Sequence, residues 1–155
     1  DALIGADGYP CLDTDNANLL SAREVYTLAC LSAKTLGVEA WRKGCKAYWG
    51  YVEEFGFTLD ELDAFEELAA LGLIARLLQG MSWADAKKEV QTKTDAMIDK
   101  AMSNGHFEAA MLMRQNTDSL HVWDGETPTE SGCTFRRLAI KLFGPKRGWK
   151  LLGSL

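Results

Sequence analysis

The sequence predicts an α/β domain in which helices pack on a mostly parallel central sheet. Short, nearly uncharged runs of β-branched and aromatic residues alternate with longer segments that have the three-to-four-residue periodicity of amphipathic helices. Such alternation is typical of layered α/β folds. The chain has 155 residues, of which 47% are hydrophobic and 25% are charged, so its length and composition suit one domain with a single core.

The first third of the chain combines a turn-rich opening with two predicted strands. Asp, Gly and Asn are frequent before residue 19, which indicates loops. We predict a buried strand over residues 24–29, where the sequence EVYTLA carries no charge after its first residue. A short helix is predicted over 38–44 and ends at Gly44, and an aromatic strand is predicted over 45–50.

The segment 59–79 is the clearest predicted helix, because apolar residues recur along it at helical spacing. Thr58 and Glu61 have the spacing of a capping box, which predicts the start of this helix. Gly72 lies in its middle, where a glycine costs about 1 kcal/mol relative to alanine. We therefore expect another element to pack closely against Gly72.

Two further helices and a last strand complete the predicted domain. The helices are expected over 82–103 and 106–116, and the strand is expected over 119–123. The protein domain is predicted to comprise residues 1–126. Residues 127–155 are expected to form a polar linker followed by a basic and apolar tail.

Charge and cysteine usage exclude several functional classes. The 17 basic and 22 acidic residues give a formal charge of −5, which argues against a general nucleic-acid partner. No apolar run approaches the roughly 20 residues of a transmembrane helix, so we predict no membrane span and a cytoplasmic protein. The four cysteines form no C-x-x-C pair, so we expect neither a zinc site nor any other cofactor.

Cys30 follows the predicted strand 24–29 and is the leading candidate for a nucleophile. Active residues in open α/β sheets gather outside the carboxyl ends of the strands. A thiolate there would be accessible, and the Cys30 backbone N–H, released from the ladder, could stabilise an oxyanion. The alternative is a core cysteine, since free cysteines are among the most buried residues.

Three acids also follow predicted strands: Glu53, Glu54 and Asp124. They could bind a basic substrate side chain, although solvated acids in loops are the commoner case. The only two histidines, His106 and His121, are predicted to be surface or half-buried packing residues. Neither lies in a loop that the sequence would place beside Cys30.

Several stretches, taken together, resemble the caspase-like cysteine peptidases, a group that includes gingipains and bacterial CHAT-domain proteases. The sequence VYTLACLSAKTLG resembles the nucleophile block of that group, and GCKAYWGYVEEF resembles the strand that follows it. RQNTDSLHVWDGE resembles the closing strand, and DALIGADG resembles the segment after the family's His-Gly pair. The likeness covers residues 1 to about 126.

The resemblance implies a three-layer caspase-like fold and a cysteine endopeptidase. Cys30 would be the nucleophile, and a histidine upstream of Asp1 would be the base. We therefore expect this chain to be the cysteine-bearing part of a protease that lacks its N-terminal part. Its expected partners are a protein substrate and the histidine-bearing portion or chain, and the family suggests a role in bacterial defence. The alternative is a non-catalytic docking or regulatory domain with the same fold.

Overall fold

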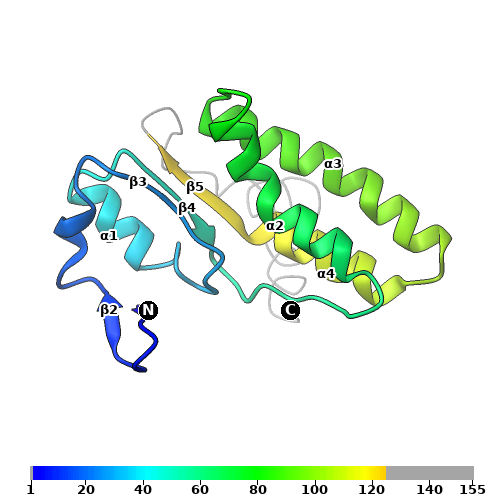
Figure 1. The fold of residues 1–155 in the computed structure, drawn as a ribbon, viewed down its shortest axis with the longest axis horizontal. Helices are drawn as coiled ribbons and strands as arrows, with labels where there is room; N and C mark the ends of the chain where they lie inside the picture. Colours follow the sequence, from blue (N-terminus) through cyan, green and yellow to red (C-terminus); the bar gives the residue numbers. More distant parts are fainter. Residues whose placement is uncertain (1, 125–155) are drawn as a thin grey trace, which may run out of the picture.

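The computed structural model describes residues 2–124, so the predicted linker and tail over 127–155 lie outside the described residues. Two small sheets, one 3₁₀ turn and four helices make up this part of the chain (Figure 1). In order, the elements are β1 (Leu3–Ile4), β2 (Pro10–Leu12), η1 (Ala17–Leu20), β3 (Glu24–Tyr26), α1 (Leu36–Arg42), β4 (Ala47–Tyr51), α2 (Leu62–Leu77), α3 (Trp83–Ser103), α4 (Phe107–Ser119) and β5 (Leu120–Asp124).

The described strands form a mixed sheet, whereas the sequence predicted a mostly parallel one. In the order β3-β4-β5, β3 pairs with β4 in parallel and β5 pairs with β4 in antiparallel orientation. Strand β5 runs in the opposite direction because α4 ends at the carboxyl end of β4, where the Ser119 carbonyl accepts the Val52 N–H at 2.9 Å. Strands β1 and β2 form a separate antiparallel hairpin.

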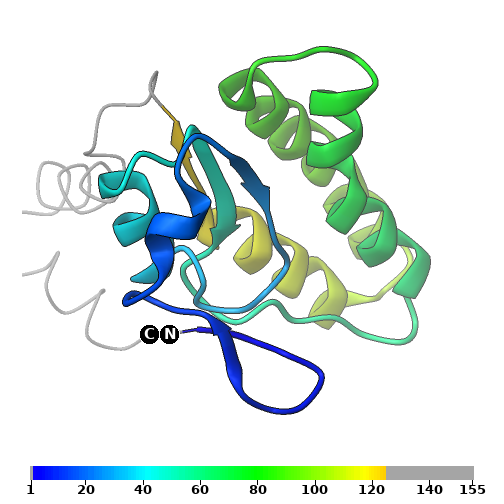
Figure 2. The same ribbon diagram turned by 60° about the vertical axis from the view of Figure 1, so that its left-hand side comes forward.

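Helices cover both faces of the three-stranded sheet, as the α/β prediction required. Alternate residues of β4 point to opposite faces. Trp49 packs in the core formed with α2, α3 and α4, whereas Tyr48 packs with Leu36 of α1 and with η1. Two views of the fold show α1 on one side of the strands and the three longer helices on the other (Figures 1 and 2).

Close packing of α2 on the sheet confirms the expectation for Gly72. A Cβ atom added to Gly72 would overlap the six-membered ring of Trp49, which is only 1% exposed. The Trp49 ring also stacks on Tyr26 with centroids 5.3 Å apart and tilts against Trp83 at 5.5 Å. These rings join β3, β4, α2 and α3 at one point.

Hydrogen bonds to a carboxylate join the start of β3 to α2 and α3. The Arg76 guanidinium donates to both Glu24 carboxylate oxygens, at 2.8 and 3.1 Å, and the Trp83 indole N–H donates to Glu24 Oε2 at 3.1 Å. The hydrogen bond from Arg76 holds the pKa of Glu24 below its usual range, although partial burial opposes this shift. A bidentate arginine–carboxylate pair fixes orientation as well as distance.

The boundaries of several elements differ from the sequence prediction. The strand predicted over 24–29 ends at Tyr26, where the chain leaves the ladder for a turn. Helix α2 begins at Leu62 rather than at 59, and the predicted capping box is absent because the Glu61 carboxylate accepts from the ring of His106 instead. Helix α3 and its Ser82 cap confirm the prediction, since Ser82 Oγ accepts the Asp85 N–H at 3.1 Å.

The contact between Trp49 and Gly72 predicts the effect of a single methyl group. We expect Gly72→Ala to lower the free energy of unfolding by about 1–2 kcal/mol, because overpacking outweighs the gain in helix propensity. Urea unfolding of the wild type and the variant would measure this loss. In a Trp49→Phe background, which removes the overlapping ring atoms, the same change should cost less. Equal costs in both backgrounds would contradict this explanation of the glycine.

Candidate functional site

Cys30 lies in an exposed turn at the carboxyl ends of β3 and β4. The last ladder bond of β3 joins the Thr27 N–H to the Trp49 carbonyl at 3.0 Å, and the turn that follows folds back over the end of β4. There the Leu31 N–H donates to the Glu53 carbonyl at 3.3 Å. The core-cysteine interpretation therefore fits Cys45, which is buried, and not Cys30.

Gly50, near the carboxyl end of β4, lets this turn pack tightly on the strand. A Cβ atom added to Gly50 would lie 2.6 Å from the hydroxyl oxygen of Ser32, which is itself buried. The Ala33 N–H extends the contact by donating to the Tyr51 carbonyl at 3.1 Å. The turn that holds Cys30 is thus supported by the central strand and not by neighbouring loops alone.

One backbone N–H contacts the Cys30 sulfur. The Phe55 N–H donates to Cys30 Sγ at 3.3 Å. Among residues 2–124, the backbone N–H of Cys30 itself has no hydrogen-bond acceptor. Leu31, the next residue, has a φ of +61°, a left-handed conformation that costs a non-glycine residue about 1–2 kcal/mol. Strained backbone of this kind clusters at functional sites.

The structure brings two of the three predicted acids to the edge that carries Cys30. Glu53 and Glu54 follow β4 after one intervening residue, Val52, and both side chains are exposed. Asp124 pairs instead with Ala47, the first residue of β4, and is buried at the opposite end of the sheet. The sequence marked all three as strand exits, but the reversed direction of β5 separates Asp124 from the others.

Among the described residues, neither histidine is bonded to the candidate nucleophile. His106 immediately precedes α4, and its Nδ1 lies 2.7 Å from Glu61 Oε1, a hydrogen bond that lowers the pKa of Glu61. His121 lies on β5 opposite Gly50, with its ring 4.5 Å from that of Trp123. Within the described part of the chain, no hydrogen bond or ion pair joins either histidine to Cys30.

The loop between β4 and α2 lines a small apolar hollow that sequence reasoning missed. Its volume is about 140 Å³, and Phe55 lines it. Because Phe55 also donates to the Cys30 sulfur, the hollow adjoins the candidate nucleophile. Phe57, another lining residue, leaves 56% of its surface exposed. The run FGF after the aromatic strand was the available signal. The full lining is Phe55, Phe57, Leu62, Phe65, Glu66 and Ala69.

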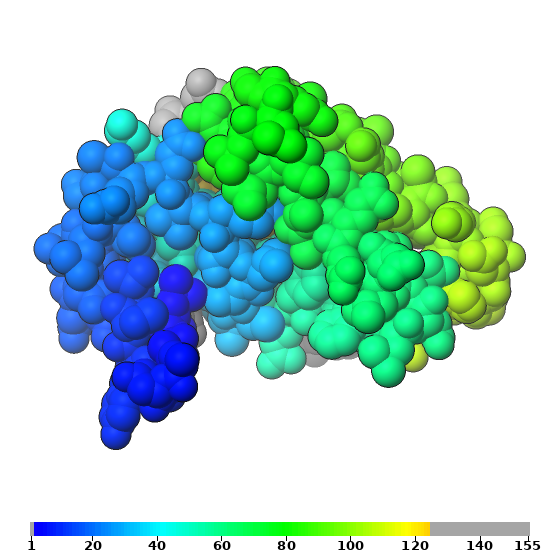
Figure 3. All heavy atoms as spheres, in the orientation of Figure 1, coloured from blue at the N-terminus to red at the C-terminus, as the bar shows by residue number. Residues whose placement is uncertain are grey.

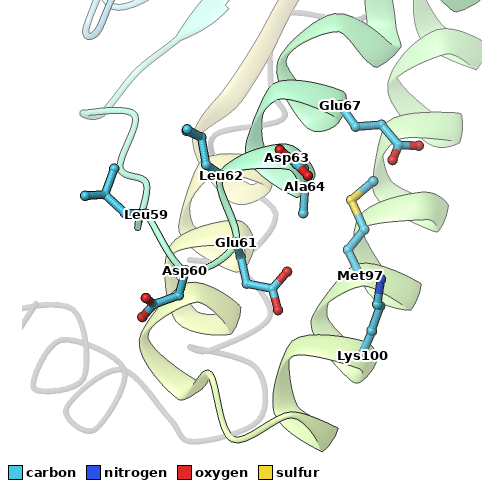
Figure 4. Close-up of a pocket in the computed structure, with 9 residues that line it drawn as sticks. All are labelled: Leu59, Asp60, Glu61, Leu62, Asp63, Ala64, Glu67, Met97 and Lys100. Atoms are coloured by element: carbon cyan, nitrogen blue, oxygen red, sulfur yellow. The ribbon is translucent and has the colours of Figure 1, made fainter.

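A larger and more polar hollow of about 320 Å³ opens between the first turn of α2, with the residues just before it, and the C-terminal part of α3 (Figure 4). Glu61, Glu67, Met97 and Lys100 are among the residues around it. None of the predicted site residues lines this hollow. The Cys30 turn and the loop after β4, by contrast, meet on one face of the molecule (Figure 3).

Within residues 2–124, we find neither a candidate metal site nor a candidate membrane-spanning helix. No group of three or more His, Cys, Asp or Glu side chains in residues 2–124 is arranged to hold a metal ion. No helix in this range combines the length and apolar character needed to cross a bilayer.

Comparison of the chain with protein-family models, with curated proteins and with solved structures found no match.

The burial of His121 predicts a pH-dependent stability. Desolvation, helped by the charge of Lys87, lowers the pKa of His121 to about 4 from its ordinary 6.5. Between these values the unfolded chain binds a proton at this site that the folded chain does not bind, so stability is lost as the pH falls. We expect this site to remove at most about 3 kcal/mol between pH 7.5 and pH 4.

Urea unfolding at pH 7.5 and pH 4.5 would measure this dependence. The variant His121→Gln should lose less stability on acidification than the wild type, whereas His106→Gln should keep the His121 contribution. An unchanged loss in His121→Gln would show that other groups cause the acid sensitivity.

Proposed function

We propose that this chain is the cysteine-bearing part of a caspase-like cysteine endopeptidase that cleaves a protein partner. The observation that carries the proposal is the environment of Cys30. Its side chain is exposed at the carboxyl end of a parallel strand, and its sulfur accepts the Phe55 N–H at 3.3 Å. The sequence resemblance to the nucleophile block supports the same assignment.

In the proposed reaction, the Cys30 thiolate attacks the carbonyl carbon of the scissile peptide bond. The negative charge moves to the carbonyl oxygen, and the Cys30 N–H is available to stabilise it, since no acceptor within residues 2–124 engages this group. The C–N bond then breaks, and a histidine gives its proton to the leaving amine. Water, activated by the same histidine, hydrolyses the thioester and regenerates the thiolate.

The histidine would be supplied by a segment or chain upstream of residue 1. Within the described residues, β3 pairs only with β4, so its other edge is the place where a further strand would add. A parallel strand there would end beside Cys30, because carboxyl ends of parallel strands meet at the same edge. The three-layer, mostly parallel caspase-like fold is part of this proposal, with the additional parallel strands supplied by that upstream portion.

The surroundings of Cys30 also favour certain substrates. Glu53 and Glu54 give this edge negative charge, which suits a basic side chain at the residue before the scissile bond. The adjoining apolar hollow with Phe57 and Leu62 suits an apolar side chain elsewhere in the same substrate.

A non-catalytic docking or regulatory domain is the second candidate. The lack of a hydrogen bond between Cys30 and either histidine within residues 2–124 favours it, because a cysteine nucleophile needs a base. The exposed side chains of Phe57 and Leu59 would then form part of a docking face.

Replacement of the nucleophile separates the two candidates. In the protein assembled with its histidine-bearing portion, we expect Cys30→Ala to lower kcat/KM for a peptide substrate by more than about 1,000-fold. Stability should change by less than about 0.5 kcal/mol, because Cys30 is exposed. The matched control Cys11→Ala, also exposed, should retain activity. Persistent cleavage by Cys30→Ala would leave the docking domain as the better candidate.

The exposed carboxylates of Glu53 and Glu54 predict a preference for a basic residue before the scissile bond. If the preceding residue is Arg or Lys, neutralising the contacting acid by Glu53→Gln or Glu54→Gln should cost more than about 2 kcal/mol, or about 30-fold in kcat/KM. Asp124→Asn serves as the control, because Asp124 lies at the other end of the sheet. Full activity of both Gln variants on basic substrates would remove the support for a basic preference.

A further inference from the structure

One buried side chain holds the middle of the loop that runs from β4 to α2. Asn116 on α4 is 1% exposed and contacts Gly56, which lies 60 positions earlier in the chain. Its Oδ1 accepts the Gly56 N–H at 2.9 Å, and its Nδ2 donates to the Gly56 carbonyl at 2.7 Å. Both backbone hydrogen-bonding groups of Gly56 are therefore held by the same side chain.

The residue next to Gly56 contacts the candidate nucleophile. The Phe55 N–H donates to Cys30 Sγ, and the Phe55 ring packs edge-on against Tyr51 and Phe65, with centroid distances of 5.1 and 6.5 Å. These ring contacts fix the side chain of Phe55, and Asn116 fixes the peptide group between Phe55 and Gly56. The direction of the Phe55 N–H thus depends on both anchors.

We propose that Asn116 is a positioning residue for Cys30: by holding Gly56, it keeps the Phe55 N–H aimed at the sulfur. A backbone N–H that donates to the sulfur limits the directions in which the sulfur can point, and so holds it in its exposed orientation. The catalytic meaning of this role rests on the peptidase proposed above. The positioning itself does not, because it concerns the reactivity of the thiol in the chain alone.

The chemistry of the amide explains why asparagine suits this position. A primary amide presents one acceptor and two donors at the end of a short side chain, so it can satisfy a peptide N–H and C=O together. Aliphatic residues offer neither group, and a carboxylate offers no donor when ionised. The neighbouring Thr117 is also buried, but its hydroxyl donates to the Met113 carbonyl within α4 and not to the loop.

The test compares Asn116→Ala with the matched control Thr117→Ala in the full 155-residue chain. The rate of alkylation by iodoacetamide near neutral pH is measured at each cysteine by mass spectrometry. Cys11 is exposed and distant in sequence from this loop, so it serves as the internal reference. We expect Asn116→Ala to slow alkylation of Cys30 by at least about threefold relative to Cys11, and Thr117→Ala to leave that ratio within about twofold of wild type.

Hydrogen exchange of the wild-type chain provides a measurement that does not depend on a variant that folds. The amides of Phe55 and Gly56 should be protected relative to those of Glu54 and Phe57, because only the former pair donates a hydrogen bond to a described group in this loop. In Asn116→Ala, both amides should lose this protection.

Three results would overturn the proposal. These are unprotected Phe55 and Gly56 amides in the wild type, a Cys30 alkylation rate that is unchanged or faster in Asn116→Ala, or an equal slowing in Thr117→Ala. These readouts involve no substrate, so they can succeed even if Cys30→Ala retains cleavage and the peptidase proposal fails. In the assembled protease, the loss in Asn116→Ala should fall on kcat more than on KM.

Discussion

The contact between Trp49 and Gly72 sets the distance between the central strand and the helices on one face of the sheet. A residue with any side chain at position 72 would push α2 away from β4, since the indole already occupies that space. The position of α2 in turn fixes where the loop from β4 must end. That loop carries Phe55 across the carboxyl edge of the sheet to Cys30, so the candidate site depends on how closely α2 approaches.

The two ends of the three-stranded sheet differ in how their polar groups are held. At the amino end, Glu24 forms an ion pair with Arg76, and the charge of buried Asp124 partly offsets the burial that lowers the pKa of Lys87. At the carboxyl end, Cys30 is exposed and its sulfur accepts a backbone N–H, and the nearby acids Glu53 and Glu54 are also exposed. Stabilising contacts at one end allow a strained turn, with Leu31 at positive φ, to persist at the other.

The three described cysteines show how environment separates thiols of one chain. Cys45 is buried and donates to the Ala47 carbonyl, and burial raises its pKa. Cys11 is exposed on the hairpin and donates to the Leu3 carbonyl. Cys30 instead accepts a hydrogen bond from a backbone N–H. Among these three sulfurs, only that of Cys30 accepts a hydrogen bond within residues 2–124, the arrangement that suits a nucleophile.

The sequence by itself determined the kinds of elements and several of their roles. Residue periodicity was sufficient to predict the long helices and the three strands, because burial on one face leaves a repeating pattern. A glycine in the middle of a helix was sufficient to predict close packing, and a cysteine after an uncharged strand was sufficient to predict a thiol at a sheet edge. Each of these patterns involves residues that are close together in the sequence, so it can be read without knowing which distant residues they contact.

Tertiary structure alone decided what those elements bring together. The direction of β5 followed from where α4 ends, and it moved Asp124 to the opposite end of the sheet from Glu53 and Glu54. Glu61 binds His106, 45 positions away, instead of capping α2. Asn116 binds Gly56, which lies 60 positions earlier. Pairings over such separations depend on how packed elements meet in space, and no repeating pattern in the sequence records that.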